Sequence, residues 1–100
     1  KLNGVVSHNT DREPIANLDK VPFPFTDELI KMGYSFPNEF TNRAMPVLTS
    51  RGCPGRCTFC CSKKMYGARI RHRSVENIIA EFTMLRNKYG IQELHIWDVG

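Results

Sequence analysis

Four cysteines stand within nine positions of this chain, Cys53, Cys57, Cys60 and Cys61, and its 100 residues contain no other. Three residues separate the first two thiols and two separate the next two, in the run CPGRCTFC. A disulfide framework would spread its cysteines over a small secreted fold, and structural zinc sites usually come as two separated pairs of ligands. Three thiolates on one tight loop instead suit an iron-sulfur cluster that keeps one iron unligated by protein.

Gly55 supports this hypothesis, because a glycine lets the backbone fold tightly beneath a cluster. The alternative is a small zinc knot completed by His72 or His95, or a set of free thiols. Neighbouring residues rarely bind one cluster together, so we expect Cys61 to be a spare thiol outside the site. Thiols that serve a metal also indicate a reducing, cytoplasmic setting.

The positive charge of the chain is concentrated around the cysteines. Residues 51–73 contain seven Arg and Lys residues and no acidic one, whereas the formal net charge of the whole chain is +4. These cations would ease reduction of an anionic cluster and attract carboxylates or phosphates, or they form a solvated surface. A nucleic-acid surface is less favoured because, apart from Tyr66, aromatic residues that could stack on bases are sparse here.

Strand signals lie on both sides of the cysteines. Residues 45–50, MPVLTS, predict a strand that ends just before the first cysteine, and the alternating run IQELHIW at 91–97 predicts a second strand. With a helix between them, the two strands should be parallel. The cysteines and Asp98 would then lie at the C-terminal ends of the strands, where α/β folds gather their ligands.

A helix is predicted over residues 75–89. Ser74 is a favourable N-cap, Glu76 suits the positive end of the helix dipole, and Gly90 supplies the C-terminal stop. Apolar side chains recur at spacings of three and four, which predicts one buried face. That face consists of Val75, Ile78, Ile79, Phe82, Leu85 and Tyr89.

Residues 1–44 are predicted to be a connector. The run VPFPF carries prolines at alternate positions, which favours an extended path. The turn-forming residues 9–11 lie between two strand-like runs and would allow a hairpin. No signal peptide or membrane-length apolar run is recognisable, and since the chain starts at Lys1 and stops just after the second predicted strand, we expect an excerpt of a longer protein.

The pattern Cys-x-x-x-Cys-x-x-Cys, in the loop after the first strand of such a unit, resembles the radical S-adenosylmethionine (SAM) superfamily. Four runs of the sequence resemble the branch of this superfamily whose barrel follows a cobalamin-binding domain, and in that branch the first of them, LDKVPFPF, closes the linker before the first strand of the barrel. The resemblance implies an α/β fold, the start of a partial (β/α) TIM-like barrel in residues 45–100, preceded by an interdomain linker in residues 1–44. The runs that carry the similarity are LDKVPFPF, TSRGCPGRCTFC, RHRSVENIIAEF and YGIQELHIWD.

The resemblance also implies cofactors and site residues. Cys53, Cys57 and Cys60 would be the ligands of a 4Fe-4S cluster whose fourth iron binds SAM, and one-electron reduction would cleave SAM to methionine and a 5′-deoxyadenosyl radical. Phe59 would lie near the adenine of SAM. Asp98 would meet the SAM amine, at a place where the branch commonly has two consecutive acids and this chain has Asp-Val-Gly.

For the whole protein, the resemblance implies a radical SAM enzyme acting on a small-molecule substrate, by methyl transfer to an unreactive carbon or by a carbon-skeleton change. Cobalamin would bind in a domain before Lys1, and a reductant such as flavodoxin or ferredoxin would supply the electron. The alternative within the superfamily is a methylthiotransferase acting on transfer RNA or a ribosomal protein. From a different class, the alternative is a zinc-stabilised binding module.

Overall fold

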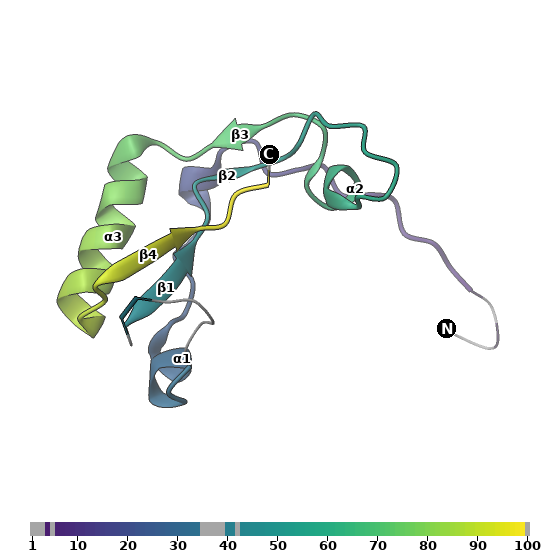
Figure 1. Cartoon of the computed structure of the whole chain (residues 1–100). Helices are drawn as coiled ribbons and strands as arrows, with labels where there is room; N and C mark the ends of the chain where they lie inside the picture. The colour runs from purple at the N-terminus through teal and green to yellow at the C-terminus, as the bar shows by residue number, and fades with distance from the viewer. Residues whose placement is uncertain (1–3, 5, 35–39, 42, 100) are drawn as a thin grey trace.

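Two parallel strands and one long helix form the centre of the molecule (Figure 1). Strand β1, Ala44–Val47, pairs in parallel with strand β4, Glu93–Ile96, and helix α3, Val75–Tyr89, connects them in the chain. The predicted α/β unit with parallel strands is therefore confirmed. The residues that the computed structural model describes are 4, 6–34, 40–41 and 43–99.

A second, smaller pair of strands leads from this centre to the cysteines. Strand β2, Ser50–Arg51, pairs antiparallel with strand β3, Arg71–His72, and the short helix α2, Ser62–Tyr66, lies between them in the chain. The predicted strand at 45–50 is therefore wrong in its extent, because it divides into β1 and β2.

The division between β1 and β2 has a hydrogen-bonding cause. The N–H of Trp97 still donates to the carbonyl of Val47, at 2.9 Å. The next N–H groups, those of Thr49 and Ser50, donate to the side chain of Asp98 and not to a backbone carbonyl of the neighbouring strand. Pairing between the two long strands therefore stops at this point.

Helix α3 covers one face of the β1–β4 pair. Met45 and Val47 alternate along β1 and are buried with Leu85 of the helix and with Ile91, which precedes β4. Burying side chains of this size stabilises the fold by roughly 1.5–3 kcal/mol each. The partly buried residues that pack against this cluster are Phe82, Met84, Tyr89 and Leu94.

Both predicted ends of α3 are confirmed. The Ser74 hydroxyl accepts a hydrogen bond from the N–H of Asn77, and Gly90 adopts a left-handed conformation with φ of 65°. The predicted apolar face is wrong in part, because Val75 and Ile79 are 70% and 54% exposed. The apolar periodicity did not reveal that an acidic residue lies on the buried side of this helix.

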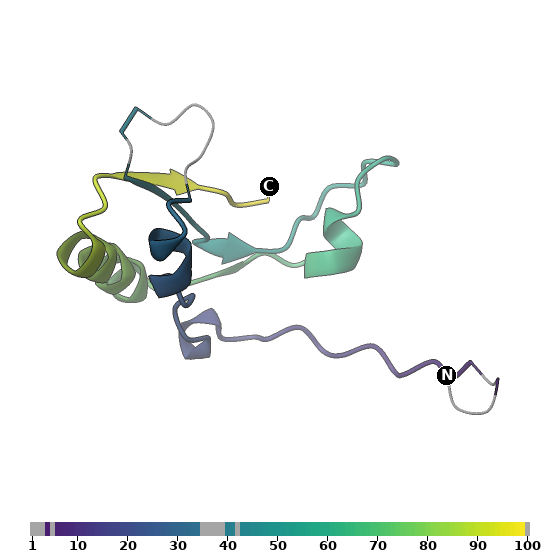
Figure 2. The ribbon, with the colours of Figure 1, turned by 90° about the horizontal axis from the view of Figure 1, so that it is seen from below.

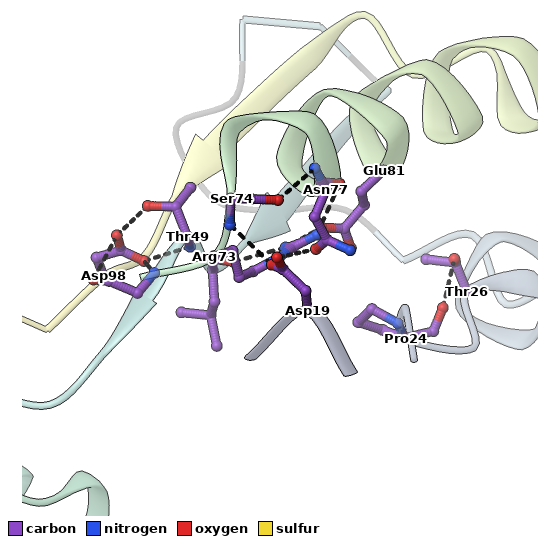
Figure 3. A network of polar contacts seen from close by, with 11 residues as sticks. Asp19, Pro24, Thr26, Thr49, Arg73, Ser74, Asn77, Glu81 and Asp98 are labelled. Carbon is purple, nitrogen blue, oxygen red and sulfur yellow. Dashed lines mark hydrogen bonds and ion pairs between the residues drawn. The ribbon is translucent and has the colours of Figure 1, made fainter. Parts of the chain in front are cut away.

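That acidic residue is Glu81, which is 3% exposed and forms an ion pair with Arg73 (Figure 3). The Arg73 guanidinium also donates to the carbonyl of Leu48 at 2.8 Å and to Oδ1 of Asn77 at 2.7 Å. Its carbon Cζ lies 5.5 Å from the centre of the Phe23 ring. One guanidinium thus joins the β1–β2 connection, α3 and the segment before β1, and it compensates the buried carboxylate.

The segment before β1 begins as an extended arm, residues 6–16, that runs away from the strands (Figure 2). Residues 4 and 6–17 contain no strand, so the hairpin suggested by the sequence is absent from that described stretch. The radius of gyration is 17.1 Å, against about 13 Å for a compact domain of this length. The arm accounts for much of this excess.

Two short helices follow the arm. The 3-10 helix η1, Leu18–Lys20, buries Leu18, and Oδ1 of Asp19 accepts the N–H of Ser74 at 2.8 Å. Helix α1, Asp27–Lys31, is tied to the end of α3 because the carboxylate of Asp27 accepts hydrogen bonds from Lys88 and Tyr89.

The predicted boundary between linker and barrel falls one residue after the start of β1. Parts of the predicted linker, residues 1–3, 5, 35–39 and 42, and the last residue of the predicted barrel domain lie outside the described residues. Among the helices that are described, none has the length and apolar character needed to cross a membrane.

Candidate metal centre

The cysteines lie on a segment, residues 52–67, which we call the cysteine loop. Its base is closed by the β2–β3 pair and by a hydrogen bond of 3.0 Å from the N–H of Cys53 to the carbonyl of Gly67. The N–H of Arg73 also donates to the carbonyl of Thr49, at 2.9 Å. These backbone contacts form a neck at the C-terminal end of β1, the position that the sequence predicts for the site.

Gly52 is required for this neck. Its φ is +112°, and a Cβ atom added to it would lie 2.1 Å from the carbonyl oxygen of Arg69. A side chain at this position would be both strained and in steric conflict with the opposite backbone. The close approach of the two ends of the loop therefore depends on a glycine.

The cysteine loop presents its thiols to solvent, and all four cysteines are free. Cys53 is half-buried at the neck, and Cys57 and Cys60 are exposed at the tip. A Cβ atom added to Gly55 would lie 3.2 Å from the Sγ of Cys53 and 3.8 Å from the Sγ of Cys57. Two of the three predicted ligands therefore converge on the space that the glycine leaves open.

The third predicted ligand follows after one turn of the chain. The N–H of Cys60 donates to the carbonyl of Cys57 at 3.3 Å, and the Sγ of Cys60 is hydrogen-bonded to the Oγ of Ser62, 3.2 Å away. Hydrogen bonds from the side chain and the backbone of Ser62 lower the pKa of the Cys60 thiol below its ordinary value of 9.0. They favour the thiolate, the form that binds iron.

Cys61 is oriented differently from its neighbour. It precedes α2 as the N-cap residue, and its thiol lies 3.6 Å from the Sδ of Met65, one helical turn further on. The Cys61 thiol therefore contacts α2.

The donor set of the loop suits a 4Fe-4S cluster. Within the described residues, no three Cys, His, Asp or Glu side chains are arranged to hold a single metal ion. The described loop does provide three free thiols, open space at a glycine beside two of them, and a hydroxyl group hydrogen-bonded to the third. Thiolates on a short curled loop are the ligands that iron-sulfur clusters use, and the residues present fit that group.

The two predicted SAM contacts lie in different environments. Phe59 is 91% exposed at the tip of the cysteine loop, beside the third thiol. Asp98 is half-buried beyond the end of β4, where its carboxylate accepts hydrogen bonds from Thr49 and Ser50. Burial alone would raise the pKa of Asp98, but these hydrogen bonds outweigh it and lower the pKa below its ordinary value of 3.8.

Arg71 has a role in the neck that the sequence did not reveal. Its guanidinium donates to the carbonyl of Ile15 in the arm, at 2.6 Å, and to the carbonyl of Tyr66 at the end of α2. The side chain of Pro14 lies 3.6 Å from the Cβ position of Gly67. The arm is thus tied to the exit of the cysteine loop, through contacts between residues too distant in sequence to leave a local pattern.

The basic run divides into two groups. Arg71 and Arg73 are half-buried and hydrogen-bond to backbone carbonyls, so they are structural. The remaining side chains give the surface around the thiols a positive potential, which stabilises negative charge on a bound group. Of these, Arg51 is half-buried, and the exposed members are Arg56, Lys63, Lys64 and Arg69.

A hollow of about 460 Å³ lies beside the C-terminal end of β1. Its walls come from the segment before β1, from the β1–β2 connection and from the end of β4. Residues on these walls include Leu18, Phe23, Leu48, Ser50, Arg73 and Trp97. The hollow is mostly apolar and borders the cysteine loop at its neck.

Comparison with known proteins places the chain in a family. Residues 47–99, from the end of β1 to just beyond β4, match the radical SAM superfamily. The chain belongs to the radical SAM superfamily. Its parallel α/β unit is accordingly the start of the partial TIM-like barrel of this superfamily of enzymes.

Several curated proteins are similar in sequence to this chain. An uncharacterized methyltransferase of Pyrococcus horikoshii is 39% identical over 98% of this chain and 21% of its own length. The cytidylyl-2-hydroxyethylphosphonate methyltransferase of Streptomyces wedmorensis is 39% identical over 81% of this chain and 16% of its own length. A Methanocaldococcus jannaschii protein, provisionally named a methylthiotransferase, is 52% identical over 35% of this chain and 8% of its own length.

The chain thus spans about a fifth of the length of the first of these relatives and less of the others. No solved structure gives a significant match to it.

Proposed function

We propose that Cys53, Cys57 and Cys60 bind a 4Fe-4S cluster whose fourth iron is left for SAM. The observation that carries this proposal is the convergence of the Cys53 and Cys57 sulfurs on the space at Gly55, in a loop at the C-terminal end of β1. When bound, the cluster supplies the electron that cleaves SAM to methionine and a 5′-deoxyadenosyl radical. Cys61, whose thiol contacts Met65, stays outside the ligand set.

The residues of the chain hold and orient the two cofactors in this proposal. Gly55 leaves room for the cluster beneath the first two thiols, and Ser62 hydrogen-bonds to the sulfur of the third. Phe59, exposed beside that thiol, would lie near the adenine of SAM. The exposed cations of the basic run offset the negative charge of the thiolates and make reduction less unfavourable.

For the whole protein, we propose methyl transfer to an unreactive carbon of a small molecule. The methyltransferase names of the two longest matches support this, and the run LDKVPFPF supports a place after a cobalamin-binding domain. A carbon-skeleton change is the other outcome that this class of chemistry allows. The electron would come from a flavodoxin or ferredoxin in a reducing compartment such as the cytoplasm.

A methylthiotransferase is the second candidate. It is favoured by one observation, the 52% identity to the M. jannaschii protein over 35% of this chain. The two candidates differ in their product. Incubation with SAM labelled in its methyl carbon, and with sulfide, would give a product that carries added sulfur only if the protein is a methylthiotransferase.

The first test is anaerobic reconstitution of the full-length protein with iron and sulfide. We expect the dithionite-reduced protein to give a 4Fe-4S electron paramagnetic resonance signal that changes on addition of SAM. Cys57→Ala should abolish this signal, and the matched control Cys61→Ala should retain it. A wild-type protein that takes up one zinc ion per chain and no cluster would contradict the proposal and indicate a zinc-stabilised binding module.

A further inference from the structure

Asp98 makes four hydrogen bonds with the β1–β2 connection and the start of β2. Its Oδ1 accepts the N–H groups of Thr49, at 2.7 Å, and of Ser50, at 3.0 Å. Its Oδ2 accepts the hydroxyl of Thr49 and, at 2.9 Å, the hydroxyl of Ser50. Figure 3 shows the carboxylate of Asp98 directed at Thr49.

These four contacts use the full hydrogen-bonding capacity of the Asp98 carboxylate. An ionised carboxylate has about four lone-pair sites, and four donors occupy them here. A cationic amine that approached Asp98 would have to displace at least one of these donors. The geometry therefore favours an internal role over the direct contact with the SAM amine that the resemblance implies.

The two residues that Asp98 holds lie at the start of the neck. The carbonyl of Thr49 accepts the N–H of Arg73, so Thr49 is fixed from both sides. Ser50 pairs with His72 in the β2–β3 ladder. Only two residues separate Ser50 from Cys53, so a shift of the Ser50 backbone would be passed directly to the first thiol.

We propose that Asp98 is a positioning residue, which acts through Thr49 and Ser50 to fix the Cys53 end of the cysteine loop relative to the strand ends. Its charge makes the four hydrogen bonds stronger than those of a neutral acceptor. Asp98, two residues beyond the end of β4, would thereby help to set the position of a cluster bound by the loop that follows β2. This proposal rests on the cluster assignment made above.

The test uses reconstituted full-length protein and variants that act from both sides of the contact. Asp98→Asn removes the negative charge and puts an amide NH2, which cannot accept, in place of the oxygen that accepts the Thr49 and Ser50 hydroxyls. Thr49→Val removes a donor hydroxyl with little change of shape. Thr49→Ser restores that hydroxyl and serves as the rescue. Asp27→Asn, at the contact of α1 with α3, is the structural control for a variant that weakens the fold elsewhere.

Three quantities are measured: the resonance signal of the reduced cluster without SAM, the rate of iron loss to a chelator, and the SAM dissociation constant of the cluster-loaded fraction. Asp98→Asn and Thr49→Val should alter the SAM-free signal in the same way and each speed iron loss about tenfold, the effect of one charge-assisted hydrogen bond. Thr49→Ser should resemble the wild type, and Asp27→Asn should leave the signal unchanged. SAM affinity should stay close to wild type throughout.

A direct contact between Asp98 and SAM would give a different set of results. If Asp98→Asn weakens SAM binding while its SAM-free signal stays wild type, and Thr49→Val changes neither, then Asp98 contacts SAM and the positioning role is overturned. If Asp98→Asn does not fold, the pair Thr49→Val and Thr49→Ser decides the question alone. A wild-type protein without a cluster would overturn the cluster assignment itself, an outcome visible before any variant is compared.

Discussion

Gly55 matters for the space that it leaves beside two sulfur atoms. Its backbone conformation is not one that demands glycine, since its φ lies outside the left-handed region. A methyl group there would lie 3.2 Å from the sulfur of Cys53, closer than most Cβ contacts. The constraint at this position is therefore one of volume next to the thiols.

We expect Gly55→Ala to reduce cluster binding while the fold is retained, because the added methyl group crowds the thiol of Cys53 and fills the space between it and the thiol of Cys57. Iron and sulfide per chain after reconstitution should fall, while the melting temperature of the apo-protein should change little. The matched control is Thr58→Ala, an exposed change in the same loop. Full cluster content in Gly55→Ala would show that the open space is not used.

The sequence predicted the roles of some residues in the candidate site and not of others. The three thiols and Gly55 were identifiable because their types and spacing are local. The bonding of Asp98 and Arg71 was not, because Asp98 meets Thr49 and Arg71 meets Ile15 across more than forty positions of chain. No spacing rule connects residues that are so far apart in sequence.

Helix α3 depends on one buried ion pair in addition to its apolar contacts. The Arg73 and Glu81 side chains are 12% and 4% exposed, and the guanidinium also holds Leu48 of the β1–β2 connection. Removing one partner of a buried pair leaves the other charge without compensation. The position of the helix on the strands is thus sensitive to Glu81.

We expect Glu81→Ala to destabilise α3 by about 3–5 kcal/mol, the usual cost of breaking a buried ion pair from one side. Hydrogen exchange of the α3 amides in the full-length protein would measure it as a fall in their opening free energy. Glu76→Ala, an exposed change in the first turn of the same helix, should cost well under half as much. Equal effects of the two changes would mean that the pair contributes nothing specific.

Whole elements were predictable where their signals were local. Helix α3 has a cap, an apolar period and a terminating glycine within its own sequence, and its bounds were predicted correctly. Helices α1 and α2 have five residues each, too few to display a period, and they were missed. The β2–β3 pair was missed because two-residue strands are defined by their partner and not by their own composition.

In the molecule as a whole, Glu93 joins the segment before β1 to the start of β4. Its Oε2 accepts the N–H groups of Phe40, at 2.8 Å, and Thr41, at 3.0 Å, and its Oε1 lies 2.7 Å from Nε2 of His95. Desolvation alone would raise the pKa of Glu93, but the hydrogen bonds from His95, Thr41 and Phe40 lower it below its ordinary value of 4.5. The ionised form is therefore the one that the fold stabilises.

A carboxyl group with a lowered pKa stabilises the fold above its unfolded-state pKa, and this contribution is lost as the pH falls through the folded-state pKa. We therefore expect the Thr41 amide to lose hydrogen-exchange protection on acidification below about pH 4.5. Glu93→Gln should lower the protection at neutral pH and remove much of this acid dependence. Glu13→Gln, an exposed change in the arm, is the control and should behave as the wild type.

The closed neck also has a consequence for how this protein can change over time. Because Cys53 is bonded to Gly67 through the backbone and Gly52 packs against Arg69, the two ends of the loop are fixed to each other whatever lies between them. Insertions or deletions between Cys53 and Tyr66 that keep Cys57 and Cys60 would thus alter the tip without moving the strands. The tip of the cysteine loop can therefore vary in evolution independently of the strands. In engineering, the tip of a relative's loop could be transplanted by keeping the two ends of the loop, at residues 52–53 and at residues 67–69.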